Sequence, residues 1–469
     1  MASYKRIIPL VVASALFMEN TDSTVIATSL PAMAADLGED PVVLKLAFTT
    51  YLLALTVFIP ISGWCADRFG ARNVFRAAIA VFTLGSIACG LSTSLEGLIA
   101  ARALQGLGGA MMVPVGRLII LRTVSKSEMV TALATLTIPA LLGPVLGPPL
   151  GGFITTYFHW RWIFWINVPF GVLGIVLATI HMPDIREEGV APLDALGFVL
   201  SGLGLSTLVF GATIVGRDIL PVYGAPALIA TGVVMTGLYI LHARRRTKPI
   251  LDLNLLKFPT FRSGVIGGSL FRIGVGAIPF LLPLMLQLGF KLTPFQSGSL
   301  TCAAALGALA MKFSAARILK RFGFRSVLVF NAVVAAAFLA IQGLFTPETP
   351  HLLILAVLLA GGFFRSLQFT SLNALAYSDI PPRDMGSATS FYIVAQQLSL
   401  AAGVVCAASV LEIAQHVRGD LTLTVADFSF AFFTVALISA FSLFSHLQLA
   451  PDAGAEVSGR GVVKAQETT

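Results

Sequence analysis

Long apolar runs alternate with short polar segments along the whole chain. Most of the runs reach the roughly 20 residues that an α-helix needs to cross a hydrocarbon core of about 30 Å. We count fourteen, at residues 7–31, 43–63, 74–94, 97–121, 130–157, 162–182, 195–216, 222–243, 262–289, 295–316, 326–346, 351–377, 386–414 and 428–449. This pattern predicts an all-α polytopic membrane protein with fourteen transmembrane helices.

The composition supports this prediction. Hydrophobic residues make up 56% of the 469 residues and charged residues only 12%, with a mean hydropathy of +0.88, whereas a soluble domain carries about 25% charge. The first run is too long for the apolar region of a signal peptide and lacks a small-residue cleavage site. We therefore expect it to remain as the first transmembrane helix.

Lysine and arginine gather in alternate loops. With the N-terminus inside, the inner segments hold 21 of the 31 basic residues, and the outer loops hold five, namely Lys45, Arg161, Arg217, Lys291 and Arg418. Because basic residues favour the cytoplasmic side in short loops, we expect both termini in the cytoplasm and the chain in the plasma membrane, the inner membrane of a bacterium. The net charge of +8 follows from this bias and gives no reason to expect nucleic-acid binding.

Two cytoplasmic loops repeat one another. The segments "GWCADRFGARNV" (63–74) and "AARILKRFGFRSV" (315–327) align on RFG, so that Arg68 matches Arg321, an offset of 253 residues. One six-helix unit from 7 to 182 needs only 176 residues, so two inserted helices fill the difference. We expect a 6+2+6 order with an N-terminal half at 1–190, inserted helices and a basic connector at 191–261, a C-terminal half at 262–450 and a disordered tail at 451–469.

Four further motifs stand in order in the first half. They are "DSTVIATSLP" (22–31), "RALQGLGGAMMVPVGR" (102–117), "GPVLGPPLGG" (143–152) and "WRWIFWINVPFG" (160–171). Together with the repeated loop, they resemble the fourteen-helix drug:proton antiporter branch of the major facilitator superfamily, most closely its multidrug exporters of the MdtD and HsrA type. The resemblance covers all fourteen helices and implies a major facilitator fold, with alternating access to a site near the membrane midplane.

Two carboxylates lie inside the first run. Glu19 and Asp22 are its only ionisable residues from 7 to 30, and each is expected to cost about 2.5 to 3.5 kcal/mol at the middle of a membrane helix. The resemblance implies that Asp22 carries a proton and that Arg102, Gln105 and Gly106 take part in proton transfer. Glu19 lies outside the family motif, so it is either a partner for an intramembrane base, a second titrating site or a recognition point for cationic drugs.

Two of the motifs have the composition of moving parts. The loop after the second helix is predicted to act as a cytoplasmic gate, in which glycines allow close backbone approach and Asp67 pairs with Arg68, Arg72 or a helix end of the other half; its residues are Gly63, Asp67, Arg68, Gly70 and Arg72. The alternative is a basic loop that only sets topology. The helix-five motif suits a hinge-like contact between the halves, because its glycines allow close packing and its prolines bend a helix; we name Gly143, Pro144, Gly147, Pro148, Gly151 and Gly152.

Five polar residues are predicted to lie at the substrate cavity, namely Asn167, Arg272, Arg365, Gln368 and Asn373. Arg365 could bind an anionic substrate or balance Glu19. The three tryptophans of the WRWIFW segment are interpreted as interfacial anchors, and the six histidines as mostly interfacial. The four cysteines show no metal-binding spacing, so we expect no metal and no cofactor.

The leading functional prediction is a proton-coupled exporter of small amphipathic compounds. An exporter of an organic acid or a metal chelate is the alternative, favoured by Arg272 and Arg365. An intramembrane enzyme is a remote alternative, because no HExxH or GxSxG motif occurs in the predicted helices. We expect protons, a small-molecule substrate and the lipid bilayer as partners, and a monomer.

Overall fold

The computed structural model describes residues 2–123, 129–187, 190, 192–215, 221, 223–246, 249–381, 384–419 and 422–458, and all regular elements among them are helical. Helices cover each of the fourteen predicted apolar runs. Among the described residues, 11 helices are long and apolar enough to cross a membrane, or up to 12 if one pair bent by 60° forms a single span. The all-helical prediction is therefore confirmed, while the count of fourteen spans in a 6+2+6 order stays a prediction.

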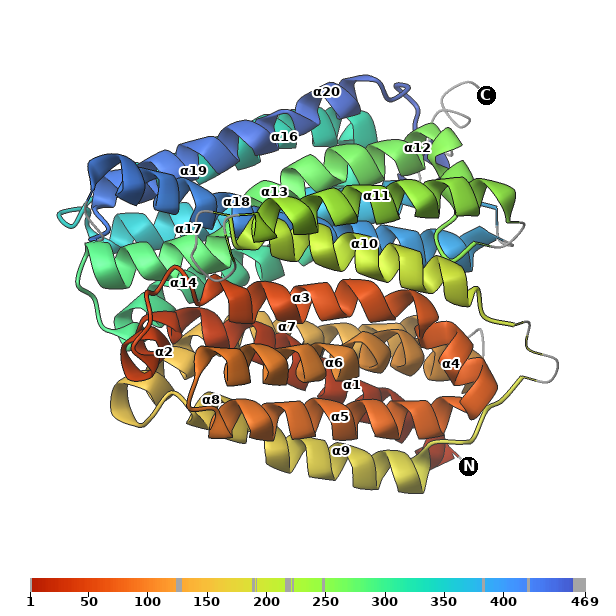
Figure 1. Cartoon of the computed structure of the whole chain (residues 1–469). Helices are drawn as coiled ribbons and strands as arrows, with labels where there is room; N and C mark the ends of the chain where they lie inside the picture. The colour runs from red at the N-terminus through yellow and green to blue at the C-terminus, as the bar shows by residue number, and fades with distance from the viewer. Residues whose placement is uncertain are drawn as a thin grey trace. The chain divides into compact units, whose positions relative to one another are not determined.

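The chain forms two compact units, of which the first comprises residues 1–242, 248–250 and 293–299. Its long helices lie side by side (Figure 1). They are α1 (Ala2–Val25), α3 (Lys45–Phe58), α5 (Ala71–Leu91), α6 (Leu95–Thr123), α7 (Met129–Tyr157), α9 (Asn167–His181), α10 (Ala195–Thr213) and most of α11 (Gly224–Arg245). The short elements are η1 (Ile26–Thr28), α2 (Leu30–Leu37), η2 (Ile59–Ile61), α4 (Ser62–Phe69) and α8 (Trp162–Trp165).

The second unit comprises residues 243–247, 251–292 and 300–469. Its long helices are α13 (Gly268–Leu284), α14 (Pro294–Lys312, whose first turn belongs to unit 1), α16 (Phe324–Gln342), α17 (His351–Ala376), α18 (Met385–Arg418) and α19 (Val425–Ala440). The short elements are η3 (Leu253–Lys257), α12 (Pro259–Arg262), η4 (Ser263–Gly267), η5 (Met285–Gly289), α15 (Ala315–Phe322), α20 (Ser442–Leu447) and α21 (Ala455–Ser458).

The sequence repeat is also a repeat of local geometry. An eight-residue helix, a glycine with positive φ and a long helix follow one another in both units, with Gly70 at φ 91° and Gly323 at φ 75°. Two residues later, Arg72 Nη1 donates to Met182 O at 3.5 Å in the first unit, and Arg325 Nη2 donates to Leu447 O at 3.2 Å in the second. The offset of 253 therefore relates equivalent positions from α4 to the start of α5.

The end of the chain is partly packed, contrary to the expectation of a disordered tail. Leu449 and Ala453 belong to a hydrophobic cluster formed with α16 and α17, and Ala455–Ser458 form the last helix. Burial of these apolar side chains explains the order. Residues 459–469 of the predicted tail lie outside the described residues.

Candidate functional site

Asp22 lies at the centre of a buried polar network in the first unit. Its side chain, in α1, is 2% exposed and forms an ion pair with Arg102, whose Nη1 lies 2.6 Å from Asp22 Oδ2. The other carboxylate oxygen, Oδ1, accepts hydrogen bonds from Gln105 Nε2 and from Asn167 Nδ2, both at 2.8 Å. Three charged or polar side chains from α6 and α9 thus donate hydrogen bonds to one carboxylate of α1.

The donors of Asp22 are themselves connected to one another. Arg102 Nη1 also donates to Gln105 Oε1 at 2.6 Å, which closes a ring of Asp22, Arg102 and Gln105. Asn167 Nδ2 lies 3.0 Å from Ser86 Oγ, and that hydroxyl donates to the Phe164 carbonyl at 2.9 Å. The network therefore fixes the tips of the donor side chains, because each donor has a second partner.

The local sequence explains why these side chains meet. Arg102 and Gln105 are three positions apart on α6, so they lie on one face of the helix. A Cβ on Gly85 would lie 2.6 Å from the Gln105 nitrogen, and one on Gly106 would lie 2.7 Å from the Tyr51 carbonyl. The two glycines therefore allow α5 and α3 to approach α6 so closely that the network is sealed from both sides.

The environment of Arg102 is apolar apart from this network. Its guanidinium carbon lies 4.2 Å from the centre of the Tyr51 ring, and Nε donates to the Ala47 carbonyl at 3.4 Å. Arg102 and Gln105 are both fully buried, and Asn167 is 2% exposed. A carboxylate so enclosed depends on its paired guanidinium, because an isolated buried charge is costly.

Glu19 lies apart from this ring. It is half-buried and is not one of the groups that contact Asp22 in the ring. The three roles open for Glu19 therefore stay predictions.

The predicted gate loop makes its contacts within its own unit. Asp67 Oδ1 pairs with Arg122 Nη1 at 2.9 Å, and Arg122 also lies 3.3 Å from Glu187. The prediction that Asp67 pairs with Arg68, Arg72 or the other half is therefore corrected, because α6 ends beside the loop and supplies Arg122. Arg68 makes no ion pair among the described residues.

The two gate glycines differ from each other. Gly70 needs its positive φ, and a Cβ there would lie 2.4 Å from Asp184 Oδ1. At Gly63, nothing among the described atoms lies within 4 Å of the Cβ position. The predicted close approach thus holds for Gly70 only.

The helix-five motif packs two ways within the first unit. Gly143, Gly147 and Gly151 lie against α1, with Cβ positions 2.9 Å or less from Asn20, Thr24 and Val25 respectively. Gly152 and Pro148 face the first turn of α14, where Phe295 N donates to Thr156 Oγ1 at 3.0 Å. Gly143, Gly147 and Gly151 therefore pack closely on α1, whereas Gly152 and Pro148 contact residues of the predicted C-terminal half, 262–450. The hinge-like role of the motif stays a prediction, and α7 stays helical through Pro144 and Pro148.

The residues predicted for the substrate cavity lie in different places. Asn167 belongs to the Asp22 network, and Gln368 is fully buried, with Asn331 Nδ2 donating to its Oε1 at 3.1 Å. Arg272 is fully buried too, donates to the Tyr392 hydroxyl and lies over its ring. Asn373 is exposed.

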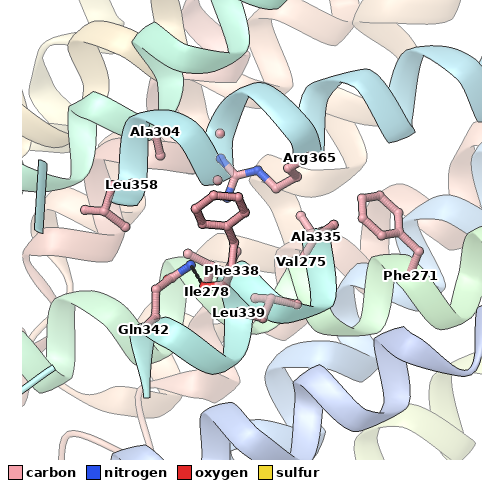
Figure 2. Close-up of a pocket in the computed structure, with 12 residues that line it drawn as sticks. Phe271, Val275, Ile278, Ala304, Ala335, Phe338, Leu339, Gln342, Leu358 and Arg365 are labelled. Carbon is pink, nitrogen blue, oxygen red and sulfur yellow. Dashed lines mark hydrogen bonds between the residues drawn. The ribbon is translucent and has the colours of Figure 1, made fainter. Parts of the chain in front are cut away.

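Arg365 is the one member of that set that lines the pocket of the second unit. Figure 2 shows its side chain directed into the space above the Phe338 ring. The remaining walls come from α13, α14, α16 and α17 and are apolar except for Gln342.

Sequence reasoning missed several polar residues that the fold brings together. His446 Nδ1 lies 3.0 Å from Ser263 Oγ, and its Nε2 lies 3.2 Å from Gln368 Nε2. His446 is fully buried, so it is not an interfacial histidine as predicted. Trp160 is likewise buried, at 3% exposure, and donates to Asp36 at 3.1 Å instead of anchoring the interface. Neither position carries a sequence signal, because each partner is at least 78 residues away.

Comparison with known proteins places the chain in a family. The sequence pattern of the Major Facilitator Superfamily matches residues 12–404 and 264–461. The chain is 37% identical over 440 residues to "Putative multidrug resistance protein MdtD" of Escherichia coli K12 and of Escherichia fergusonii, with 92% of each chain covered.

Solved transporters share the fold. A peptide transporter POT crystallised with sulfate superposes with a TM-score of 0.71 at 14% identity, covering 96% of this chain and 95% of its own. A D-xylose-proton symporter gives 0.69 at 14% identity, covering 96% and 99%. The chain therefore belongs to the Major Facilitator Superfamily and is a multi-span membrane transporter of small molecules rather than an enzyme.

Proposed function

We propose that the chain is a secondary active exporter that exchanges protons for small amphipathic compounds by alternating access. The observation that carries the proposal is the Asp22 network: a carboxylate inside a membrane helix, ion-paired with Arg102 and 2% exposed. An ionisable residue at such a place is a functional residue by default. The similarity to a multidrug resistance protein over 92% of the chain supports export of drug-like substrates.

Proton binding at Asp22 would remove the negative charge of the network. In the observed arrangement the carboxylate accepts three donors from α6 and α9. A proton on Oδ1 or Oδ2 removes the negative charge and leaves the Arg102 guanidinium buried without a counter-charge, a situation that costs about 3 to 5 kcal/mol in proteins. Protonation would therefore favour a second arrangement of α1 against α6 and α9, in which Arg102 finds another partner.

The energy of one proton suffices for useful export. A proton moving through 100 mV supplies about 2.3 kcal/mol, and each unit of pH difference adds about 1.4 kcal/mol. The potential alone thus supports a substrate gradient of roughly 45-fold. An exchange of one proton for one substrate molecule needs only a single titrating carboxylate.

The decisive experiment uses the purified protein in liposomes with an acidic lumen and a pH-sensitive dye. Lipophilic cations, neutral drugs and organic acids are added outside, and proton release is followed for the wild type, Asp22→Asn and Glu19→Gln. We expect release with the wild type and none with Asp22→Asn. Glu19→Gln, a carboxyl-to-amide change one turn away on the same helix, is the matched control and should keep coupling.

A substrate-exchange measurement without a pH gradient separates coupling from folding. Asp22→Asn should still exchange labelled substrate across the membrane, because its binding site is intact. Proton release by Asp22→Asn at the wild-type rate would remove Asp22 from the mechanism.

We also propose that the cluster of Asp67, Arg122 and Glu187 forms a cytoplasmic gate. In this proposal the protein lies in a bacterial inner membrane, has both termini in the cytoplasm and acts as a monomer. The Arg122 side chain bridges the loop before α5 to the segment after α9, so the three elements would have to separate when this end opens. Reporter fusions at the two termini test the orientation. Opposite sides for the two ends would contradict it.

Export of an organic acid or metal chelate remains the second candidate, carried now by Arg365 alone. Arg272 does not support it, because the Tyr392 hydroxyl and the Gly264 carbonyl already accept hydrogen bonds from its guanidinium. The same liposome assay separates the two candidates: release provoked only by organic acids would favour the second.

A further inference from the structure

A second buried polar network lies in the second unit, around His446 of α20. His446 Nδ1 lies 3.0 Å from Ser263 Oγ of η4, and its Nε2 lies 3.2 Å from Gln368 Nε2 of α17. Gln368 Oε1 in turn accepts a hydrogen bond from Asn331 Nδ2 of α16 at 3.1 Å. His446, Gln368 and Asn331 are fully buried, and Ser263 is 4% exposed. One row of side-chain hydrogen bonds therefore joins four separate elements.

A backbone carbonyl fixes the direction of these hydrogen bonds. Asn331 Nδ2 lies 2.6 Å from the Phe364 carbonyl oxygen, so the amide nitrogen faces that oxygen and its second hydrogen goes to Gln368 Oε1. Gln368 Nε2 is then the donor toward His446 Nε2. Because His446 Nε2 accepts, the single hydrogen of the neutral ring is on Nδ1, which donates to Ser263 Oγ. The network thus selects an uncharged His446 in one tautomer.

A proton added to Nε2 of His446 would disrupt this arrangement. The imidazolium donates through both ring nitrogens, so its Nε2 hydrogen would face the amide hydrogens of Gln368. Turning the Gln368 amide over would bring its oxygen to the Leu328 carbonyl oxygen, which lies 3.4 Å from the present amide nitrogen, and its nitrogen to the amide nitrogen of Asn331. In either case, protonation of His446 breaks at least one link of the network.

The surrounding charges do not compensate an imidazolium. The charged or titratable residues on the elements that pack against α20 or carry Gln368 are Arg325 on α16, Arg272 on α13, Asp427 on α19, and His351 and Arg365 on α17. Arg325 Nη2 donates to the carbonyl of Leu447, the residue after His446, at 3.2 Å. Asp427, the one carboxylate among the described residues of these elements, is paired with Arg418 at 2.8 Å. A charged His446 would therefore have a cation beside it and no free carboxylate.

The network also holds a stretch of irregular backbone. η4 is a π-helix of five residues within the span Pro259–Gly289, a form that is rare and is frequent at functional sites. Two side chains hold it: His446 contacts its first residue, and Arg272 Nη1 donates to the Gly264 carbonyl at 3.4 Å. A Cβ on Gly267 would lie 2.7 Å from His446 Cε1, so the imidazole ring packs directly on the η4 backbone. Loss of the His446 contacts would leave η4 with only one of these two side-chain contacts.

We infer that His446 is a second proton-responsive site, at which binding of a proton from water to Nε2 releases α20 from α17 and from η4. The neutral ring stabilises the arrangement of this structure, and the charged ring is incompatible with it. The contact of Arg325 with Leu447 places His446 at the end of the second unit that carries the repeated RFG loop, which is the cytoplasmic end in the proposed orientation. The inference goes beyond the proposed function and does not depend on the coupling role of Asp22.

The first test reads the ionisation of His446 directly. Protein labelled with ¹⁵N-histidine is purified in detergent and studied by NMR, because a ring nitrogen without a hydrogen resonates far from one that carries a hydrogen. At neutral pH we expect one ring with its hydrogen on Nδ1 alone, whose signals are absent in His446→Gln and which becomes doubly protonated in acid. Gln368→Glu places a carboxylate oxygen against Nε2, so its His446 should be doubly protonated at a pH at which the wild-type ring is neutral.

Amide hydrogen exchange measures the release. In the wild type, exchange of residues 263–267, corrected for the intrinsic effect of pH, should become about 5- to 150-fold faster as His446 takes up its proton, the range for loss of its two hydrogen bonds. Gln368→Glu should not show this acceleration, because an ion pair replaces the hydrogen bond that the proton breaks.

His181→Gln is the matched control. His181 precedes Met182, whose carbonyl accepts from Arg72 in the first unit as the carbonyl after His446 accepts from Arg325 in the second. This variant and Asp22→Asn should leave the ionisation of His446 and the exchange of residues 263–267 unchanged. A failure of Asp22 as the coupling site would therefore leave this result intact.

A wild-type His446 that carries its hydrogen on Nε2, or that is charged at neutral pH, would overturn the inference. So would equal exchange of residues 263–267 before and after protonation, or an acceleration in Gln368→Glu as large as in the wild type. An acceleration of the same size throughout the second unit would also overturn it, since acid would then loosen the whole unit rather than release α20.

Discussion

The ion pair of Asp22 and Arg102 can be tested quantitatively by removing each partner separately and both together. The side chains are 2% and 0% exposed and their charged atoms lie 2.6 Å apart. Asp22→Asn leaves a guanidinium buried without a counter-charge, which is expected to cost about 3 to 5 kcal/mol, or a factor of roughly 150 to 5,000 in the unfolding equilibrium. The double variant with Arg102→Met has no buried charge at this site and should recover much of that loss.

The two single variants should differ in their response to pH. In Arg102→Met, the remaining carboxylate of Asp22 keeps the amide donors of Gln105 and Asn167, and in acid it can take up a proton and become neutral. The cost of Arg102→Met should therefore shrink as the pH falls. The cost of Asp22→Asn should stay constant as long as the wild-type ion pair remains charged, because a guanidinium keeps its proton throughout the accessible range.

The assay is unfolding in mixed micelles with a rising fraction of SDS, followed by the fluorescence of the four tryptophans. The exposed pair of Asp67 and Arg122, with side-chain exposures of 29% and 26%, is the matched control and should give a coupling energy below about 1 kcal/mol. A coupling as small as this for Asp22 and Arg102, or a pH-independent cost of Arg102→Met, would refute the view that the pair is charged and buried.

Three further predictions concern the backbone and the outer surface. Gly106→Ala should destabilise the fold by about 1 to 3 kcal/mol in the same assay, because its Cβ would lie 2.7 Å from a carbonyl of α3. Gly63→Ala is the control. Its Cβ meets open space, so the stability of the fold should stay unchanged or rise by about 0.5 to 1 kcal/mol. Gly70→Ala should cost at least about 1 kcal/mol of stability, because φ is +91° there. The alanine Cβ would also meet the segment after α9, so unchanged stability would contradict the close contact of this loop with that segment. The hydrogen-bonded Arg161 holds the pKa of Asp36 below its usual value. This contact therefore stabilises the fold above about pH 4, and the stabilisation is lost as the pH falls through the lowered pKa. Asp36→Asn should cost under about 1 kcal/mol of stability at neutral pH, and its stability should approach that of the wild type in acid.

The helices and several residues of the Asp22 network could be predicted from sequence because their signals are local. A run of 20 apolar residues needs no knowledge of its neighbours, and an ionisable residue such as Asp22 stands out inside it. Arg102 and Gln105 share one helical face, so their spacing alone brings them together. What the sequence does not contain is the pairing itself, since Asp22 and Arg102 are 80 residues apart.

The failures follow from contacts that depend on tertiary packing. Asp67 could have paired with several bases near it in sequence, and the fold selects Arg122 because α6 ends beside the loop. Arg272 looked like a cavity base, yet its surroundings contain Tyr392, whose position 120 residues away gives no local signal. In both cases the residue type was informative and its partner was not predictable.

The two units repeat one scaffold with different polar side chains beside it. The contact of Gly106 with α3 and the contact of Gly362 with α14 bring equivalent helices together. Beside that contact, the first unit holds the buried ion pair of Asp22 and Arg102, whereas in the second unit Arg365 lines a small cavity. Arg365 makes no ion pair among the described residues, so its charge is not balanced by a carboxylate as that of Arg102 is. The same helix contact is therefore compatible with two different arrangements of charge beside it.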